Sequence, residues 1–408
     1  MRDRSNEREP VIIVGAGLGG LAAALALLQR GFDVEVHEQA AVLREVGAGV
    51  QISPNGSRVL EALGILDAVR RTACETQGKE VRLWSTGQTW KLFDLGAESV
   101  RRYGFPYFTV YRVDLHDALI NAVRAIKPSA IHLGRRCVAV ENVEGGVRAR
   151  FDDGTEVRGR ALVGADGIHS AVRNSLFKPV ESTYARLVAW RGVVPMAGVP
   201  EHLRRPVATN WVGPGGHVIH YPLRNGELMN FVGYLERNEW VAESWNVQGS
   251  AAECARDFAG WNNDVQALIA SIEAPFKWGM VRRPPLECWS EGAVTLLGDA
   301  CHAMFPFLAQ GAVMSLEDAL VLGRSFAQFQ GDEVSASSAY EQARKERTYR
   351  VVEGSAQNLG RFHNPLLADP VEAPRYIERE WASRRVQDRY DWIFDYDATS
   401  VPLGVATS

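Results

Sequence analysis

Cysteine is scarce in this chain of 408 residues, and the cysteines it has are scattered. The five are Cys74, Cys137, Cys254, Cys288 and Cys301, and no two of them form a CxxC pair. An odd number of scattered cysteines is typical of a reducing compartment, so we expect no disulfide framework and a cytoplasmic location. His302 follows Cys301 with no further cysteine or histidine at metal-ligand spacing, so the sequence predicts no metal site and His302 is taken as incidental.

The sequence also lacks long apolar runs and a large excess of charge of either sign. The longest apolar stretch, residues 12–28, is interrupted by glycines and falls short of the roughly 18 unbroken residues of a membrane span. No cleavage site of small residues follows it, so it is not a signal peptide. A net charge of -4 does not favour nucleic acid or an anionic membrane as a partner. The length suggests two or three domains.

What the sequence does have is a glycine cluster near its start, in VIIVGAGLGGLAAALALLQRGFDVEVHEQA (residues 11–40). Gly15, Gly17 and Gly20 have GxGxxG spacing between a predicted buried strand and a predicted helix, which is the context that a dinucleotide-binding turn needs. In such a turn the first glycine allows the tight bend and the second lets the backbone approach a pyrophosphate. The third lets helix and strand pack closely. The helix N-terminus then directs free N–H groups at the phosphates.

An acidic residue ends the strand that follows this helix. Glu38 lies about 20 residues after the glycines, where a carboxylate can accept hydrogen bonds from ribose hydroxyls and would repel a 2′-phosphate. We expect Leu18 and Gln39, which flank the turn and the acid, to contact the cofactor as well. The turn by itself does not distinguish NAD from FAD, and no second GxGxxG follows a predicted strand.

Two further stretches accompany the glycine motif: GADGIHSAVR (164–173) and LLGDACHAMFPFLAQGAVMSLEDA (296–319). Together the three resemble the single-component, FAD-dependent aromatic hydroxylases, the flavoprotein monooxygenases of the p-hydroxybenzoate hydroxylase type, from residue 11 to about residue 350. Shorter stretches, among them YRVDLHDALI, AWRGVVP and YPLRNGELMN, make the chain most similar to 3-hydroxybenzoate 6-hydroxylases. The chain also resembles salicylate 1-hydroxylases and 6-hydroxynicotinate 3-monooxygenases.

The resemblance implies a function and leaves alternatives open. It implies non-covalent FAD, NADH or NADPH as a transient co-substrate, and hydroxylation of a 3-hydroxybenzoate- or salicylate-class acid with O2 through a flavin C4a-hydroperoxide. One alternative is a hydroxypyridine carboxylate such as 6-hydroxynicotinate as substrate. Others are a non-hydroxylating flavoprotein on the same scaffold and a nucleotide-binding redox sensor without turnover. A halogenase is disfavoured because the sequence has no W-x-W-x-I-P stretch. The ring position attacked, loss of the carboxylate, the choice of nicotinamide cofactor and the oligomeric state, with a homodimer as one option, stay open.

The resemblance also implies cofactor contacts outside the glycine turn. Glu38 would hold the adenosine ribose, and Arg112 in YRVDLH would reach the FAD phosphates or ribose. Asp166 and Gly167 in the second stretch would serve both FAD and NAD(P)H.

The third stretch would hold the other end of the cofactor. Asp299 would contact the ribitol or ribose, and Gly311 and Ala312 would bring backbone N–H groups to the isoalloxazine ring. A helix that begins near Gly311 has its positive dipole end there, which would stabilise a reduced flavin that is anionic at N1.

The candidate catalytic residues lie in GGHVIHYPL (215–223). As a strand, this segment places His217 and Tyr221 on one face, about 13 Å apart, and His220 on the other. Histidine titrates nearest to neutral pH and is the natural general base for a phenol. The resemblance places the histidine and tyrosine of H-x-x-x-Y-P against the substrate hydroxyl, whereas His220 is taken as structural.

Gln51, Pro306 and Phe307 are further candidates for the substrate pocket, again by resemblance. The 3-hydroxybenzoate enzymes carry a glutamine where this chain has Pro306. The nicotinate enzymes carry histidines where it has Phe307 and Gln51. An apolar Phe307 suits a benzene ring better than a pyridine ring.

The predicted fold is α/β, with an FAD-binding Rossmann-like (GR2-type) domain assembled from separated segments: 1–76, 103–180 and 281–360. Residues 77–102 and 181–280 are expected to form a β-rich substrate domain, with one helix near residues 251–272. Residues 361–408 are expected to form a helical C-terminal segment, in which RYDWIFDYD (389–397) is either core or an interface.

Overall fold

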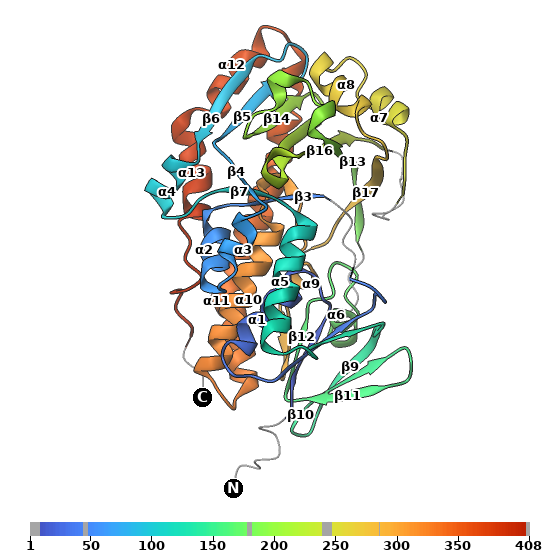
Figure 1. The fold of residues 1–408 in the computed structure, drawn as a ribbon, viewed down its shortest axis with the longest axis vertical. Helices are drawn as coiled ribbons and strands as arrows, with labels where there is room; N and C mark the ends of the chain where they lie inside the picture. The colour runs from blue at the N-terminus through green and yellow to red at the C-terminus, as the bar shows by residue number, and fades with distance from the viewer. Residues whose placement is uncertain (1–8, 44–47, 178–181, 239–246, 285, 405–408) are drawn as a thin grey trace.

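The computed structural model describes residues 9–43, 48–177, 182–238, 247–284 and 286–404. Its framework is two sheets at opposite ends of the long axis, with most of the helices between and beside them (Figure 1). The expected boundary between residues 180 and 181 lies outside the described residues.

The first sheet contains the strand that precedes the glycine turn. Its strand order is β18 (Ser290–Glu291), β19 (Val294–Leu296), β12 (Ala161–Gly164), β1 (Val11–Val14), β2 (Val34–Glu38) and β8 (Ile131–Leu133). Neighbouring strands from β19 to β8 are parallel, so the carboxyl ends of β1, β2 and β12 meet at one edge. The apolar side chains of β1 are buried, as a strand covered on both faces requires.

The second sheet is larger and mostly antiparallel. Its strand order is β17 (Phe276–Arg282), β13 (Thr183–Pro195), β16 (Leu228–Glu236), β15 (Gly216–Leu223), β14 (Val207–Gly213), β5 (Gly78–Leu83) and β6 (Thr89–Asp94). Only β5 and β14 pair in parallel within this order. Side chains alternate between a face toward the first sheet, called the inner face below, and an outer face.

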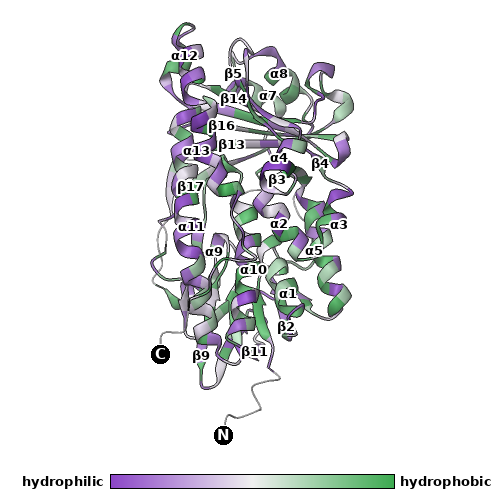
Figure 2. Ribbon diagram, turned by 90° about the vertical axis from the view of Figure 1, so that its left-hand side faces the viewer, coloured by the Kyte–Doolittle hydropathy of each residue, from purple (hydrophilic) through white to green (hydrophobic). Residues whose placement is uncertain are grey.

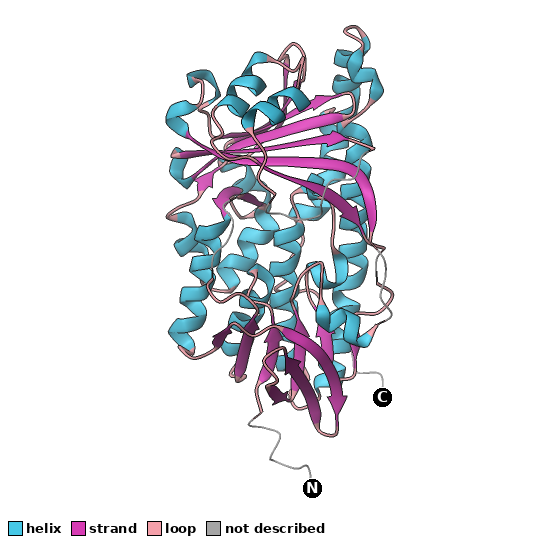
Figure 3. Ribbon diagram, turned by 90° about the vertical axis from the view of Figure 1, so that its right-hand side faces the viewer, coloured by secondary structure: helices cyan, strands magenta, loops and turns pink. Residues whose placement is uncertain are grey.

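The outer face is covered by two short helices, α7 (Ala251–Asp257) and α8 (Asn263–Ala270), which lie above the sheet in Figure 3. Trp190 and Trp211 of the sheet are fully buried beneath them, in a cluster with Phe258. The prediction of one helix in this segment was wrong. The chain takes a positive φ of 82° at Gly260, and the Asn262 side chain accepts from the N–H of Asp264 to begin a new helix.

The remaining elements connect and flank the sheets. The smaller sheets are β3 (Gly49–Ile52), β7 (Phe108–Tyr111) and β4 (Cys74–Glu75), and β11 (Glu156–Gly159), β10 (Gly146–Phe151) and β9 (Cys137–Val143). The helices between β1 and β13 are α1 (Leu18–Leu28), α2 (Pro54–Ala62), α3 (Leu66–Arg70), α4 (Ala97–Tyr103), α5 (Arg112–Ile126) and α6 (Ala171–Leu176). Later helices are α9 (Asp299–His302), α10 (Gly311–Gln328), α11 (Glu333–Phe362), α12 (Glu372–Glu380) and α13 (Ser383–Phe394). The 3-10 turns are η2 (Met196–Gly198), η3 (Glu201–Leu203), η4 (Arg224–Gly226), η5 (Pro306–Leu308) and η6 (Pro365–Ala368).

The C-terminal helices pack against their own chain. Figure 2 shows that much of α12 and α13 is hydrophilic, whereas α1 is largely hydrophobic. On α13 the rings of Tyr390 and Phe394 contact Phe93, and Phe394 also contacts Tyr103 and Tyr107. The aromatic segment therefore contributes to the core. No helix in the described ranges has the length and hydropathy needed to cross a bilayer.

Candidate functional site

The glycine turn joins β1 to α1 with two glycines in tight contact and one in open space. Gly15 has a φ of 102°, and a Cβ there would lie 2.5 Å from the carbonyl oxygen of Ala165. A Cβ on Gly20 would lie 2.0 Å from the carbonyl oxygen of Gly15. A Cβ on Gly17 would meet no atom within 4 Å. The first and third glycines are thus needed by the fold, while the second leaves room for a ligand.

Two side chains from elsewhere in the chain hold this turn at Ala16. The Glu38 carboxylate accepts a hydrogen bond from the Ala16 N–H (2.8 Å) with one oxygen and from the Ala40 N–H (2.9 Å) with the other. His116 of α5 donates through Nε2 to the Ala16 carbonyl (2.7 Å). We did not single out His116 from the sequence. Its only signal was its place one turn after Arg112.

Asp166 lies beside this turn at the carboxyl end of β12. Its carboxylate accepts from the N–H groups of Ala171 (2.7 Å) and Val172 (3.1 Å) and from the Ser170 hydroxyl, so it caps the start of α6. Burial raises the pKa of the Asp166 carboxyl above its ordinary value. Gly167 follows with a φ of 75° and open space around its Cβ position.

Arg173, the last residue of GADGIHSAVR, joins that stretch to the third one. It is buried and donates to the carbonyl oxygens of Ile168 (2.8 Å) and Ala300 (3.0 Å). No sequence pattern distinguishes Arg173 from other arginines, because its partners Ile168 and Ala300 are 5 and 127 positions away.

Asp299 begins α9 after Gly298, which has a φ of 66°. Asp299 is exposed to solvent, yet its surroundings desolvate the carboxyl and raise its pKa, an effect that the nearby His302 and Arg112 partly offset. Asp299 lines a small pocket together with Arg173 and His302, which explains how it can be both accessible to solvent and surrounded by protein. The fold thus brings Arg112 and Asp299 near each other from distant positions in the chain.

The N-termini of α1 and α10 lie side by side, next to Leu297 just before α9. A Cβ on Gly19 would come within 2.6 Å of the Leu297 side chain and 3.1 Å of the Ser315 side chain. Neither helix has a side-chain hydrogen bond from its N-cap residue. A Cβ on Gly311 would meet nothing within 4 Å, and Ala312 is partly exposed. Two positive helix ends with unfilled space form a site suited to an anionic ligand.

A buried network of charged side chains supports these helix ends. Glu317 and Asp318 on α10 are fully buried, and Arg344 of α11 contacts both, at 2.8 and 2.7 Å. Arg347 makes a second contact with Glu317 (2.8 Å), and His302 of α9 lies 2.6 Å from Asp318. The view of His302 as incidental was therefore wrong. Its role became visible only once α9 and α10 were placed together.

The network continues through amide and hydroxyl groups to the N-cap of α10. Asn55 donates to Glu317 (2.8 Å) and to the Gln310 amide oxygen (3.1 Å). Gln310 in turn donates to the Ser53 hydroxyl (2.9 Å). These contacts engage the side chain of Gln310 and leave the backbone N–H groups at the start of α10 uncapped.

His217 and Tyr221 lie on the inner face of the second sheet, as the strand pattern predicts, and His220 lies on the outer face among buried residues. Burial lowers the pKa of His220 to about 3. The ring of His217 packs against Phe307 of η5 and Tyr234 of β16, with centroids 5.0 and 4.6 Å away. Burial lowers the pKa of His217 well below its ordinary value, and the neighbouring His363 lowers it further.

Tyr221 is at the other end of this surface, with Gln51. The Gln51 amide hydrogen-bonds Tyr221 and accepts from the Tyr107 hydroxyl (2.8 Å). Burial raises the pKa of the Tyr221 hydroxyl, so Tyr221 stays protonated and acts as a hydrogen-bonding group rather than a base. A Cβ on Gly49 would lie 2.5 Å from the Tyr221 ring, so β3 presses directly on this tyrosine.

Pro306 and Phe307 differ in their surroundings although they are adjacent. Phe307 is buried against His217, and its carbonyl oxygen accepts from Asn358 of α11 (2.9 Å). Pro306 is exposed. Lys79 on β5, which sequence analysis missed, is buried with its ammonium 4.9 Å from the Tyr107 ring centroid, and burial lowers its pKa to about 7.

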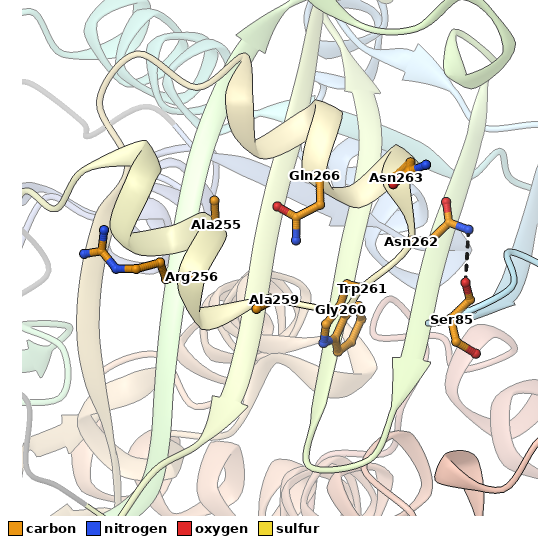
Figure 4. A pocket seen from close by; sticks show the side chains of 9 residues that line it. All are labelled: Ser85, Ala255, Arg256, Ala259, Gly260, Trp261, Asn262, Asn263 and Gln266. Carbon is orange, nitrogen blue, oxygen red and sulfur yellow. Dashed lines mark hydrogen bonds between the residues drawn. The ribbon is translucent and has the colours of Figure 1, made fainter.

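A separate pocket lies on the outer side, between α7, α8 and the loop at Ser85 (Figure 4). Its lining includes Arg256, Trp261 and Gln266, and Asn262 donates to the Ser85 carbonyl at its rim (3.3 Å). His217 and Tyr221 face the opposite side of the sheet, so this pocket is distinct from the surface they form. Within the described ranges, no group of three or more His, Cys, Asp or Glu side chains is arranged to hold a metal ion.

Comparison with known proteins places this geometry among flavoenzymes. A family profile described as "FAD binding domain" matches residues 8–355. A 3-amino-4-hydroxybenzoate 2-monooxygenase of Streptomyces platensis is 36% identical over 397 residues, covering 97% of this chain and 98% of the relative. A 3-hydroxybenzoate 6-hydroxylase of Polaromonas naphthalenivorans is 35% identical, covering 95% and 96%. The crystal structure of Klebsiella pneumoniae HpxO complexed with FAD and uric acid is similar with a TM-score of 0.82 and 28% identity, over 98% of this chain and 99% of that one.

Proposed function

This chain belongs to the FAD-binding domain family of flavin-dependent aromatic hydroxylases, and we propose that its substrate is a hydroxylated benzoate of the 3-hydroxybenzoate or salicylate class. The family predicted from the three sequence motifs is thereby confirmed, with FAD as cofactor and a mixed α/β fold. The observation that carries the substrate proposal is the inner face of the second sheet, where His217 meets an apolar ring, Phe307.

The residues at the glycine turn, at the start of α10 and at Asp299 fit FAD. The open position at Gly17, in front of the uncapped N-terminus of α1, suits the pyrophosphate. Each oxygen of the Glu38 carboxylate accepts one N–H and keeps a lone pair for a ribose hydroxyl. The uncapped start of α10, at Gly311 and Ala312, suits the flavin ring, and Asp299 suits the ribitol. Leu18 and Gln39 are proposed contacts on either side of the turn.

Bound FAD, reduced by NADH or NADPH, would supply the oxygen-activating chemistry. The protein's own groups would prepare the ring. His217 would accept the proton of the ring hydroxyl, which makes the ring electron-rich. Tyr221, held by Gln51, would hydrogen-bond the substrate without losing its own proton. The buried Phe307 would exclude water from the reacting edge.

Further proposals concern organisation. We propose that the segments around the first sheet hold FAD and those of the second sheet hold the substrate, with the divisions given above. We propose that the protein acts in the cytoplasm, since the cysteines are unpaired in the described ranges. A homodimer stays a proposal that light scattering with size-exclusion chromatography would test.

A panel of acids tests the proposed substrate class. Salicylate, 3-hydroxybenzoate, 3-amino-4-hydroxybenzoate and 6-hydroxynicotinate would each be added to holoenzyme with NADH or NADPH, and products identified by mass spectrometry. A hydroxylated benzoate should accelerate NAD(P)H consumption many-fold with stoichiometric product. Product from 6-hydroxynicotinate alone would favour the hydroxypyridine alternative. Acceleration that yields only hydrogen peroxide would reject the substrate while leaving the enzyme class.

Gly17→Ala tests the proposed phosphate site. The new methyl group meets no protein atom within 4 Å, so the apoprotein should keep its melting temperature. If the pyrophosphate lies against Gly17, FAD affinity should fall by at least about tenfold, which corresponds to about 1.4 kcal/mol of binding free energy. Isothermal titration of apoprotein with FAD measures this. Gly360→Ala, also in open space, is the matched control and should leave FAD affinity unchanged. Equal affinity for the Gly17 variant and the control would place the pyrophosphate elsewhere.

A further inference from the structure

We propose that His217, His363 and Glu236 form a proton relay that carries the proton of the bound ring hydroxyl from the pocket to the protein surface. The Nδ1 of His217 lies 2.7 Å from the Nε2 of His363, and the Nδ1 of His363 lies 3.0 Å from a carboxylate oxygen of Glu236. The two histidines are buried, while the Glu236 side chain is 55% exposed. This inference rests on the proposed role of His217 as the base.

Three distant segments assemble this line of groups. His217 is on β15, Glu236 is the last residue of β16, and His363 is the C-cap residue that follows α11. Backbone contacts fix their positions. Gly215 donates to the His363 carbonyl (3.2 Å), and the Glu236 N–H donates to the Gly215 carbonyl (2.9 Å). The end of the long helix is thereby tied to the β14–β15 turn, which holds His363 between the other two.

The hydrogen-bonding capacity of each group fixes the direction of the relay. An ionised carboxylate only accepts, so His363 must carry a proton on Nδ1. In neutral His363 the Nε2 is then an acceptor, so His217 must donate from its own Nδ1. The Nε2 of neutral His217 is left with a free lone pair and makes no hydrogen bond to any of the described residues. Through His363, the Glu236 carboxylate therefore fixes the tautomer of His217 in which Nε2, on the side away from His363, can accept a proton.

The relay also explains how a histidine that resists charging can serve as a base. Burial lowers the pKa of His217 and of His363, because an imidazolium would be poorly solvated there. In the relay, the ring O–H bond breaks as Nε2–H forms on His217. The Nδ1 proton of His217 moves to Nε2 of His363, and the Nδ1 proton of His363 moves to Glu236. The products are a phenolate, two neutral imidazoles and a carboxylic acid that releases its proton to water.

The surroundings of the two histidines favour this path over direct exchange with solvent. The His217 ring is enclosed by the rings of Tyr234, Phe307 and Phe362, in addition to His363. Apart from His363, Tyr234 is the titratable group among these rings, and burial raises the pKa of its hydroxyl, so it stays neutral. His363 is the neighbour that can pass a proton on.

The first test reads the tautomers without any substrate. In holoenzyme labelled with ¹⁵N-histidine, NMR should report His217 and His363 as neutral Nδ1–H tautomers between pH 6 and 8. Glu236→Gln should preserve both tautomers, because the glutamine carbonyl still accepts from His363. His217 in the Nε2–H form, or as imidazolium at neutral pH, would overturn the relay.

The second test measures turnover with the acid that wild type hydroxylates fastest. Glu236→Gln keeps the shape of the side chain but cannot take up the proton. We expect its kcat to fall about tenfold at pH 7, less than the roughly 100-fold minimum typical for losing a positioned general base, because water can partly replace an exposed group. The KM for the acid should stay within about twofold, since Glu236 does not touch the pocket. Glu227→Gln, an exposed glutamate just before β16, is the control and should match wild type.

The two tests separate the relay from the proposed function. A kcat for Glu236→Gln equal to that of the control would reject the relay while hydroxylation by wild type still supported the function. No product from wild type with any acid would reject the function, and the NMR measurement would still decide whether the hydrogen-bonded tautomers exist. A loss of kcat together with a changed tautomer of His217 in Glu236→Gln would indicate a structural effect and also count against the relay.

Discussion

His217→Asn should leave a yellow holoenzyme that hydroxylates its acid about 100- to 10,000-fold more slowly than wild type, the range for losing a general base. Asparagine cannot accept and pass on the proton of the ring hydroxyl, so the ring stays a poor nucleophile. FAD should still bind, because none of the groups at the glycine turn or the start of α10 contacts His217. NAD(P)H consumption should continue with hydrogen peroxide in place of product. The measurements are product yield, peroxide yield and the flavin spectrum.

The control for this variant is His220→Asn. His220 is equally buried and only three residues away, but it lies on the outer face of the sheet. We expect its hydroxylation rate to stay within a few-fold of wild type. More than a tenth of wild-type hydroxylation in His217→Asn would mean that another group deprotonates the ring. Equal losses in the two variants would indicate damage to the strand rather than loss of a base.

Arg344→Met should destabilise the protein by about 3–5 kcal/mol, the cost of leaving buried charge without its partner. Arg344 is fully buried and contacts both Glu317 and Asp318. Methionine fills similar space but leaves two buried carboxylates with less compensation from cations. Urea unfolding of apoprotein and holoenzyme measures the loss. FAD affinity should also fall, because Glu317 and Asp318 anchor the helix whose first turn would hold the flavin in the proposed site.

The stability loss from Arg344→Met should be smaller at pH 5 than at pH 8. In wild type, burial raises the pKa of Asp318, but His302 and Arg344 lower it more, so the net pKa is below its ordinary value. Asp318 is therefore ionised throughout the range above pH 5, and its contribution to stability is constant there. In the variant, a buried carboxyl that has lost its cation has a raised pKa. Between pH 8 and pH 5 the folded variant therefore binds more protons than its unfolded state, and it is stabilised as the pH falls. Arg350→Met, exposed on the same helix, should cost no more than about 1 kcal/mol, its contact with Trp392. If Arg344→Met lowered the free energy of unfolding no more than this control, the two buried carboxylates would not need the Arg344 cation for stability.

The sequence was most informative where function depends on short-range backbone geometry. The strand, the glycine spacing, the helix and the acid at Glu38 all lie within one segment, and the structure has them as β1, α1 and β2. The face of His217 and Tyr221 followed from the two-residue period of a strand. The start of α10 at Gly311 followed from its resemblance to a longer motif. The strand, the helix and the alternating faces depend on contacts between residues close in sequence, whereas Gly15 also packs against the distant Ala165.

Tertiary structure alone decided which distant groups meet. Single-sequence patterns do not predict the contact of His217 with His363, 146 positions apart, or that of His302 with Asp318, 16 positions apart, because those contacts depend on how helices are docked. The break between α7 and α8 was missed for a related reason: the apolar pattern continues across it while Gly260 reverses the chain. By itself the sequence determined the cofactor, the class of chemistry and the candidate base. Only the folded chain decided how buried charges are compensated and which groups hydrogen-bond that candidate base, because solvation and hydrogen-bond partners are set by packing between segments.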